Sequence, residues 1–197
     1  MKPLFRLVGN ALIIMNAALI LTQLQGCVGV VAAGGAGAAV AADRRSAGTI
    51  VDDEAIELKT GNAIFGDDDL GTKAHINITS FDYVVLLTGE TPTAAMRDRA
   101  VDIARHVDKV RKVYNEIVVA QPTTVKSRGT DTWITAQIKA RLLGNEDVSS
   151  ANVKVVTENR TVYLLGIVSH AEAKAATETA RFVDGVTRVI ALFEYQD

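Results

Sequence analysis

The stretch that decides the fold is Val162-Tyr163-Leu164-Leu165-Gly166, because the chain carries a second version of it, Val85-Leu86-Leu87-Thr88-Gly89, 77 positions earlier. Both runs are short, apolar and closed by glycine, as expected for strands buried in a sheet. A pattern that recurs at a fixed separation indicates that one structural unit occurs twice. The sequence therefore predicts two similar domains.

The residues around both runs extend the repeat. Ile76-Asn77-Ile78 and Val153-Lys154-Val155 alternate in polarity ahead of the runs, which is typical of strands. After the runs, Thr91-Pro92 and the Ser169/Glu172 capping box start helices. Each copy also begins with residues at helical spacing after an aspartate. These are Ile56, Thr60 and Ile64 after Asp53, and Ile134, Ile138 and Leu142 after Asp131. Each copy closes with a predicted strand, in residues 110–119 and 186–195.

The order helix, strand, strand, helix, strand predicts the fold class. It is α+β, with a three-stranded mixed sheet in each copy and two helices that cover one face of that sheet. Each copy has only about 70 residues, so its core is small and packing of the two copies against each other is plausible.

Composition divides the chain into five parts. Residues 1–26 have the pattern of a signal peptide, and residues 27–49 are a Gly/Ala-rich tether. Residues 50–120 form the first domain, residues 121–129 a polar linker and residues 130–197 the second domain.

The N-terminus predicts a membrane anchor. Lys2 and Arg6 precede an apolar run, and Leu24-Gln25-Gly26-Cys27 follows it. This arrangement resembles a bacterial lipoprotein signal. The resemblance implies cleavage before Cys27 and acylation of Cys27, which gives a stable anchor. Because residue 28 is Val and not Asp, it also implies the outer membrane, on its periplasmic face.

Several function classes are excluded by composition and motifs. A formal net charge of −2 does not suggest a nucleic-acid partner. His75, His106 and His170 are scattered, without the spacing of a metal or nucleophilic site, and no phosphate loop occurs. Asp67-Asp68-Asp69 lacks the spaced ligands of a Ca²⁺ loop. We therefore expect no enzyme activity, no metal and no cofactor.

The first helix of the second copy contains the only Trp of the chain. Ile134, Ile138 and Leu142 form its apolar stripe, and Thr130 or Asp131 is expected to cap its first turn. Trp133 lies roughly 140° from Ile138 around the helix axis, off that stripe. In the first turn, the indole would stand beside unpaired N–H groups that attract anions. The alternatives that stay open are contact with lipid headgroups and burial of Trp133, either in the core or between the two copies.

Charge favours the second copy as the lipid-binding one. The first helix of the first copy begins with Asp52-Asp53-Glu54, which would repel anionic headgroups, and residues 50–120 carry a net charge of −5. Residues 121–197 have a net charge of zero, and Lys126 and Arg128 stand just ahead of the predicted helix. The candidate lipid-binding residues are Gly129, Thr130, Thr132, Trp133, Ile134, Gln137, Lys139, Arg141 and Leu143.

Three runs of the second copy carry a resemblance to a known family. They are residues 129–135 (GTDTWIT), residues 150–159 (SANVKVVTEN) and residues 172–176 (EAKAA), with Gly89 and Gly166 as strand-end glycines. With the lipoprotein signal, they resemble the dual BON-domain lipoproteins of the outer membrane. The resemblance implies a non-enzymatic protein that binds anionic phospholipid, phosphatidylglycerol or cardiolipin, through the first helix of its second domain. It also implies a role in outer-membrane integrity, with enrichment at the division site.

A different function stays open beside lipid binding. The acidic first domain could offer a sheet edge or a helix face to an envelope protein partner. In that reading the protein is an adaptor, and Trp133 is buried between the domains.

Overall fold

The computed structural model describes residues 43–196. The predicted signal peptide, Cys27 and the tether up to residue 42 lie outside the described residues. Among the helices of the described part, none has the length and apolarity needed to cross a membrane.

Domain 1 comprises α3 to β3 and follows the predicted order. Its sheet has the order β1-β2-β3, in which β1 and β2 are antiparallel and β2 and β3 are parallel. A single-turn helix, α4, is an addition between the first helix and the first strand. The elements are α3 (Ala47–Phe65), α4 (Leu70–Lys73), β1 (His75–Phe81), β2 (Val84–Thr91), α5 (Ala94–Arg105) and β3 (Lys112–Val119).

Domain 2 comprises α6 to β6 and repeats this plan. Its sheet has the order β4-β5-β6, again with one antiparallel and one parallel pair. Two mixed three-stranded sheets in tandem confirm the predicted fold class. The elements are α6 (Val125–Leu143), η2 (Ser150–Asn152), β4 (Val153–Glu158), β5 (Thr161–Val168), α7 (His170–Arg181) and β6 (Arg188–Tyr195).

The strand-end glycines are required by close backbone approach. A side chain at Gly89 would collide with the carbonyl oxygen of His75, and Gly89 has a φ of +109°. A side chain at Gly166 would collide with the carbonyl oxygen of Asn152. Each glycine therefore lets the middle strand pass next to the start of its antiparallel neighbour.

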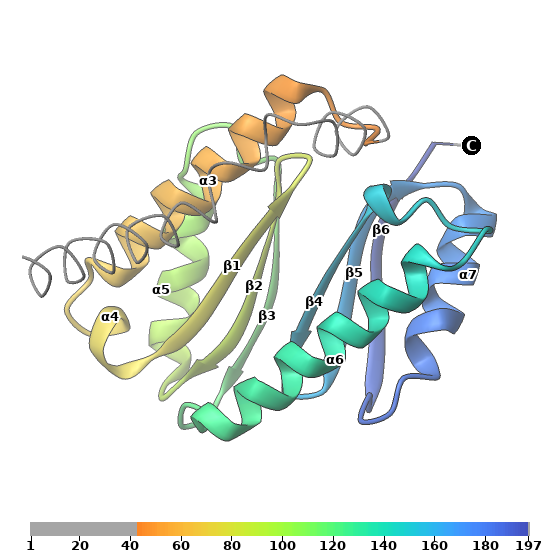
Figure 1. Cartoon of the computed structure of the whole chain (residues 1–197). Helices are drawn as coiled ribbons and strands as arrows, with labels where there is room; N and C mark the ends of the chain where they lie inside the picture. The colour runs from red at the N-terminus through yellow and green to blue at the C-terminus, as the bar shows by residue number, and fades with distance from the viewer. Residues whose placement is uncertain (1–42, 197) are drawn as a thin grey trace, which may run out of the picture. The chain divides into compact units, whose positions relative to one another are not determined.

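Each sheet packs on helices with one face and on the other sheet with its opposite face (Figure 1). In β5, Val162 and Leu164 face α6 and α7, whereas Tyr163 and Leu165 face domain 1. Every residue of β2 is buried, which fits a strand covered on both faces. The sheet-to-sheet cluster consists of Phe81, Leu86, Tyr163 and Leu165, with Tyr114, Val156, Ile167, Ile190 and Leu192 around it.

A buried aspartate holds the hairpin turn of each domain. In domain 2, the Asp131 carboxylate accepts hydrogen bonds from the backbone N–H groups of Asn159 (2.9 Å) and Arg160 (2.8 Å). Both turn residues have positive φ, at 45° and 60°, as a type I′ turn requires. Asp53 bonds Asp82 and Tyr83 of domain 1 in the same way. These bonds offset the strain of left-handed backbone at residues other than glycine.

Asp131 is therefore not the helix cap that the sequence suggested. Thr124 caps α6, accepting a hydrogen bond from the backbone N–H of Ser127 at 3.3 Å. The expected start of the helix at residues 130–131 was wrong, because the first turns of α6 lie within residues 125–129 of the predicted linker. The predicted tether also ends too late, since α3 begins at Ala47 with Ser46 as its cap.

Replacement of Asp131 by Ala should lower the free energy of unfolding of domain 2 by about 2–4 kcal/mol, because two hydrogen bonds to a buried charged group are lost. Denaturant unfolding, followed by circular dichroism, measures this change. Asp147→Ala, in an exposed loop, is the matched control and should change it by less than about 0.5 kcal/mol. Equal effects of the two substitutions would contradict this role of Asp131.

Candidate lipid-binding surface

The position of Trp133 along α6 differs from the sequence prediction. Because α6 begins at Val125, Trp133 lies in the third turn, where backbone N–H groups are bonded within the helix. The expected anion attraction by a helix N-terminus beside the indole was wrong. Any attraction of anions at Trp133 must come from side chains.

The two faces of α6 are sharply different. Ile134 and Ile138 are completely buried in the core of domain 2, so the assignment of Ile134 as a lipid contact was wrong. Trp133 is 51% exposed and Leu143 is 78% exposed on the opposite side of the helix. Trp133 is therefore not sealed between the domains, and that reading of its role was wrong as well.

The other uncharged candidates differ in what they can offer a ligand. The hydroxyls of Thr130 and Thr132 donate to the carbonyls of Lys126 and Arg128, so both are engaged within the helix. Gln137 is half-buried. Gly129 has open space around its Cα. Since helical side chains lean toward the N-terminus, a residue at 133 projects over the turn that contains Gly129, where no side chain covers it.

Charge distinguishes α6 from its counterpart in domain 1. Four basic residues and one acidic residue lie on α6, and the acidic one, Asp131, is buried. The helix α3 has the reverse balance, four acidic residues and one basic residue. The exposed surface of α6 therefore combines apolar side chains with cations and presents no carboxylate.

Lys139 and Arg141 are both exposed near the C-terminal end of α6. The Arg141 guanidinium donates a hydrogen bond of 2.7 Å to the carbonyl of Phe182, which follows α7 and is 71% exposed. Sequence reasoning missed Phe182. The only signal was an aromatic residue where a helix usually ends in glycine.

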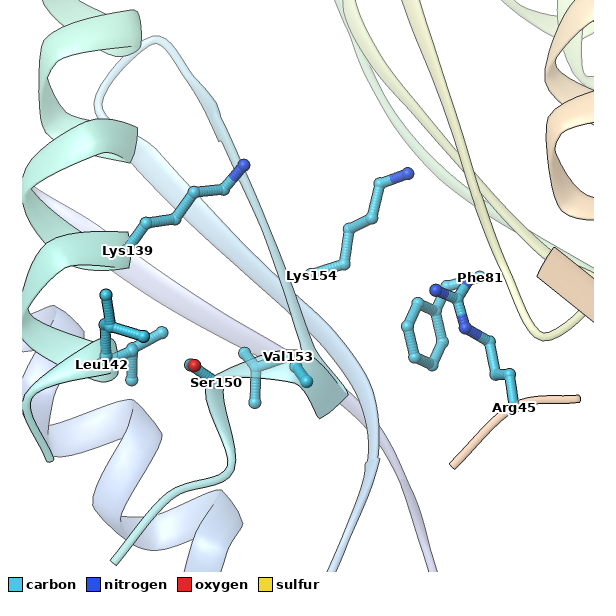
Figure 2. Close-up of a pocket in the computed structure, with 9 residues that line it drawn as sticks. Arg45, Phe81, Lys139, Leu142, Ser150, Val153 and Lys154 are labelled. Atoms are coloured by element: carbon cyan, nitrogen blue, oxygen red, sulfur yellow. The ribbon is translucent and has the colours of Figure 1, made fainter. Parts of the chain in front are cut away.

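A pocket next to the end of α6 brings three cations together (Figure 2). Lys139 comes from α6, Lys154 from β4 and Arg45 from the segment before α3, and Phe81 and Leu143 contribute apolar walls. Lys154 pairs with Glu57 at 3.1 Å. Within residues 43–196, Lys139 forms no ion pair, so its charge is available to an external anion.

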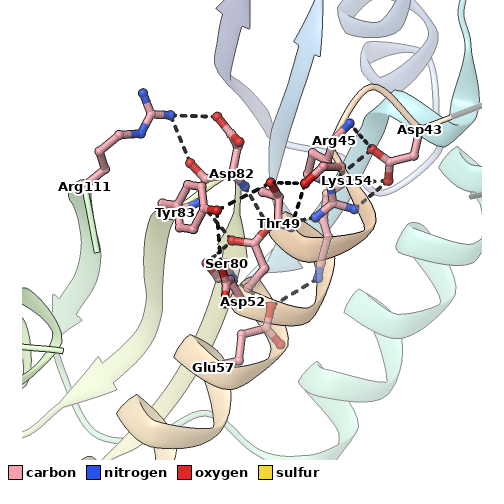
Figure 3. A network of polar contacts seen from close by, with 12 residues as sticks. Asp43, Arg45, Thr49, Asp52, Glu57, Ser80, Asp82, Tyr83, Arg111 and Lys154 are labelled. Carbon is pink, nitrogen blue, oxygen red and sulfur yellow. Dashed lines mark hydrogen bonds and ion pairs between the residues drawn. The ribbon is translucent and has the colours of Figure 1, made fainter. Parts of the chain in front are cut away.

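Residues 43–46, the N-terminal arm, fasten the start of the described chain to both domains. Arg45 bonds Asp43 (Figure 3) and also the buried Asp53. Its guanidinium stacks over the ring of Phe81, 3.9 Å from the ring centroid. Arg44 makes two hydrogen bonds, of 2.7 and 3.1 Å, to the Glu172 carboxylate of domain 2. The described part of the chain thus begins beside the pocket at the end of α6.

Comparison with known proteins divides the chain into the same two domains as the structure. The BON domain model matches twice, over residues 52–121 and 130–197. The chain belongs to the BON-domain family. It is a protein with two BON domains, similar in this respect to DolP.

Three relatives of this BON protein align over most of both chains. It is 39% identical to the outer membrane lipoprotein DolP of Haemophilus influenzae over 175 residues, 88% of this chain and 91% of the relative. It is 41% identical to a 21 kDa hemolysin of Actinobacillus pleuropneumoniae, over 78% of this chain and 79% of the relative. It is 34% identical to the osmotically-inducible protein Y of Escherichia coli, over 78% of each chain.

The arm contact of the BON protein leads to a prediction about Glu172. The Arg44 hydrogen bonds, reinforced by the Ser169 backbone N–H and hydroxyl, outweigh desolvation and lower the pKa of Glu172 to about 2. A depressed carboxyl pKa stabilises the fold above the ordinary value near 4.5, and this stability is lost as pH falls toward about 2.

Arg44→Met should raise the pKa of Glu172, measured by side-chain NMR titration. Arg181→Met, whose partner is the exposed Glu178, is the control and should leave the Glu172 titration unchanged. An unaltered Glu172 titration in Arg44→Met would show that the arm does not hold this carboxylate.

Proposed function

We propose that this protein is a non-enzymatic lipoprotein on the periplasmic face of the outer membrane, anchored through Cys27, that docks α6 on anionic phospholipid. The observation that carries the proposal is the exposed indole of Trp133 on a helix whose exposed charges are all basic. The relative named outer membrane lipoprotein DolP supports the location.

The energetics favour anionic over neutral headgroups. An indole is stable at the membrane interface, where its ring lies among acyl carbons and its N–H faces water or phosphate. Each Lys or Arg near an anionic surface adds about 1 kcal/mol. Lys139 and Arg141 are two positions apart and project from different sides of α6, so only one of them can face the membrane together with Lys126. These two cations add about 2 kcal/mol, which a zwitterionic surface would not supply.

The anchor and α6 have separate roles in this proposal. Acyl chains at Cys27 provide most of the membrane affinity, and α6 provides orientation and selectivity for phosphatidylglycerol or cardiolipin. Arg45 of the N-terminal arm and Lys139 line one pocket, so the described chain begins on the side of the protein where α6 ends. Through this contact the protein supports outer-membrane integrity at the division site.

A second candidate function is favoured by an exposed stripe on α3. Val51, Leu58 and Phe65 recur every seven residues and are all exposed, so they lie on one side of the helix. An apolar stripe flanked by carboxylates fits a basic amphipathic segment of a protein partner better than an anionic membrane. Domain 1 would then act as an adaptor while domain 2 contacts lipid.

Co-sedimentation with vesicles tests the lipid proposal. The chain of residues 28–197, which lacks the acylated cysteine, should sediment with vesicles that contain phosphatidylglycerol and stay in solution with phosphatidylcholine vesicles. Trp133→Glu should reduce the sedimented fraction at least about tenfold, because the interfacial side chain is lost and a repelling charge is added.

Leu58→Glu is the matched control, since it places the same charge on the outer side of the corresponding helix in domain 1. It should sediment like the wild type. Loss of binding in Leu58→Glu with retention in Trp133→Glu would contradict the lipid role of α6 and assign the contact to domain 1.

A further inference from the structure

Two carboxylates and one imidazole converge where the two domains meet. His75 and Glu90 are paired residues of β1 and β2, so their side chains project from the same face of the sheet. Glu158 ends β4 of domain 2. One ligand atom of each side chain lies within 4.8 Å of the other two. The lipid-binding surface of α6 does not include these residues.

Both carboxylates are held in place through one oxygen. Glu158 accepts from the Asn77 amide at 2.6 Å and from the Thr88 hydroxyl at 3.4 Å, both at Oε2. Glu90 accepts from the backbone N–H and the hydroxyl of Thr123, again at Oε2. Within residues 43–196, neither Oε1 accepts a hydrogen bond, and Oε1 of Glu158 lies 4.0 Å from Nε2 of His75.

Neither carboxylate of the cluster forms an ion pair with a Lys or Arg of the described residues, although Glu90 is only 4% exposed and Glu158 only 6%. Arg128 lies nearby, since burial lowers the pKa of His75 and the charge of Arg128 lowers it further. Arg128 lines the adjoining pocket with His75 and Glu158, but its guanidinium bonds the carbonyl of Thr123 and its Nε is buried without a partner. Two buried carboxylates that face each other are costly unless a cation lies between them or one of them is protonated. Burial, with Glu90 nearby, accordingly raises the pKa of Glu158, and a bound cation would let both carboxyls stay ionised.

We propose that His75, Glu90 and Glu158 bind a Zn²⁺-class divalent ion that clamps domain 1 to domain 2. One imidazole nitrogen and two carboxylate oxygens are ligands that zinc accepts, and their two negative charges balance the ion. Mg²⁺ and Ca²⁺ prefer six or more oxygen ligands, which this cluster does not offer. The adjoining pocket leaves room for a water molecule as fourth ligand.

The geometry requires only a small adjustment. If the three ligand atoms lie 4.8 Å apart, an ion at equal distance from all three is about 2.8 Å from each. Zinc bonds to nitrogen and oxygen are shorter, about 2.0–2.2 Å. Inward shifts of less than about 1 Å, within the reach of Glu and His side chains, therefore close the site. Asn77, Thr88 and Thr123 act as second-layer groups that orient the ligands.

Zinc competition with a chromogenic chelator tests the proposal. The full chain with Cys27→Ser, purified in detergent, should bind one Zn²⁺ per chain. Millimolar Mg²⁺ should not displace this zinc. Glu158→Gln should weaken zinc binding at least about 100-fold, because loss of a direct ligand exceeds the effect of losing an orienting group. Excess Zn²⁺ should raise the Tm of the parent protein and leave that of Glu158→Gln unchanged.

His106→Gln is the matched control, because His106 is an exposed histidine next to a carboxylate, Asp102, and lies outside the cluster. It should bind zinc like the parent. If circular dichroism shows that Glu158→Gln does not fold, zinc binding is measured instead on His75→Gln, because His75 lies at the half-buried edge of the cluster. Absence of zinc binding by the parent, or binding that survives loss of His75, would overturn the proposal.

Discussion

The structure depends on one packing constraint. Two helices can cover only one face of each three-stranded sheet, and the opposite faces of both sheets carry apolar side chains, among them Leu86 and Leu165. A domain of this size buries little surface, so leaving such an apolar face in water would cost it much of its stability. The two sheets therefore bury these faces against each other, and the helices are left on the outside of both domains.

This constraint explains how the two copies of the repeated unit can carry different outer surfaces. Since α3 and α6 occupy corresponding positions, each keeps an inner stripe for its core and has an outer side free to diverge. On α6 that side holds Trp133, Leu143 and basic residues, whereas on α3 it holds Val51, Leu58 and carboxylates. The junction of the sheets additionally brings His75 next to Glu158, which no single domain could do.

Much of the fold was accessible from the sequence because it repeats. The strands and the strand-end glycines agreed between the two copies, which is the condition for a reliable prediction. The Ser169/Glu172 capping box forms as predicted, whereas Thr93, and not Thr91, caps α5. The start of α6 could not be predicted from the sequence, because Thr124 and Asp131 are equally good capping residues. The choice depends on a tertiary contact, since the Asp131 carboxylate bonds the hairpin turn and Thr124 caps the helix. Exposure of Trp133 and the convergence of Glu90 with Glu158 depend on tertiary packing, and no local pattern encodes them. The same holds for the arm contact of Arg44 with Glu172, which are 128 positions apart.

Fluorescence of Trp133, the only indole in the chain, tests the central claim most directly. Vesicles of phosphatidylglycerol with brominated acyl chains should shift its emission to the blue and quench it, whereas brominated phosphatidylcholine vesicles should do neither. Unchanged Trp133 emission on anionic vesicles that nevertheless sediment the protein would contradict the account, because another surface would then contact the membrane.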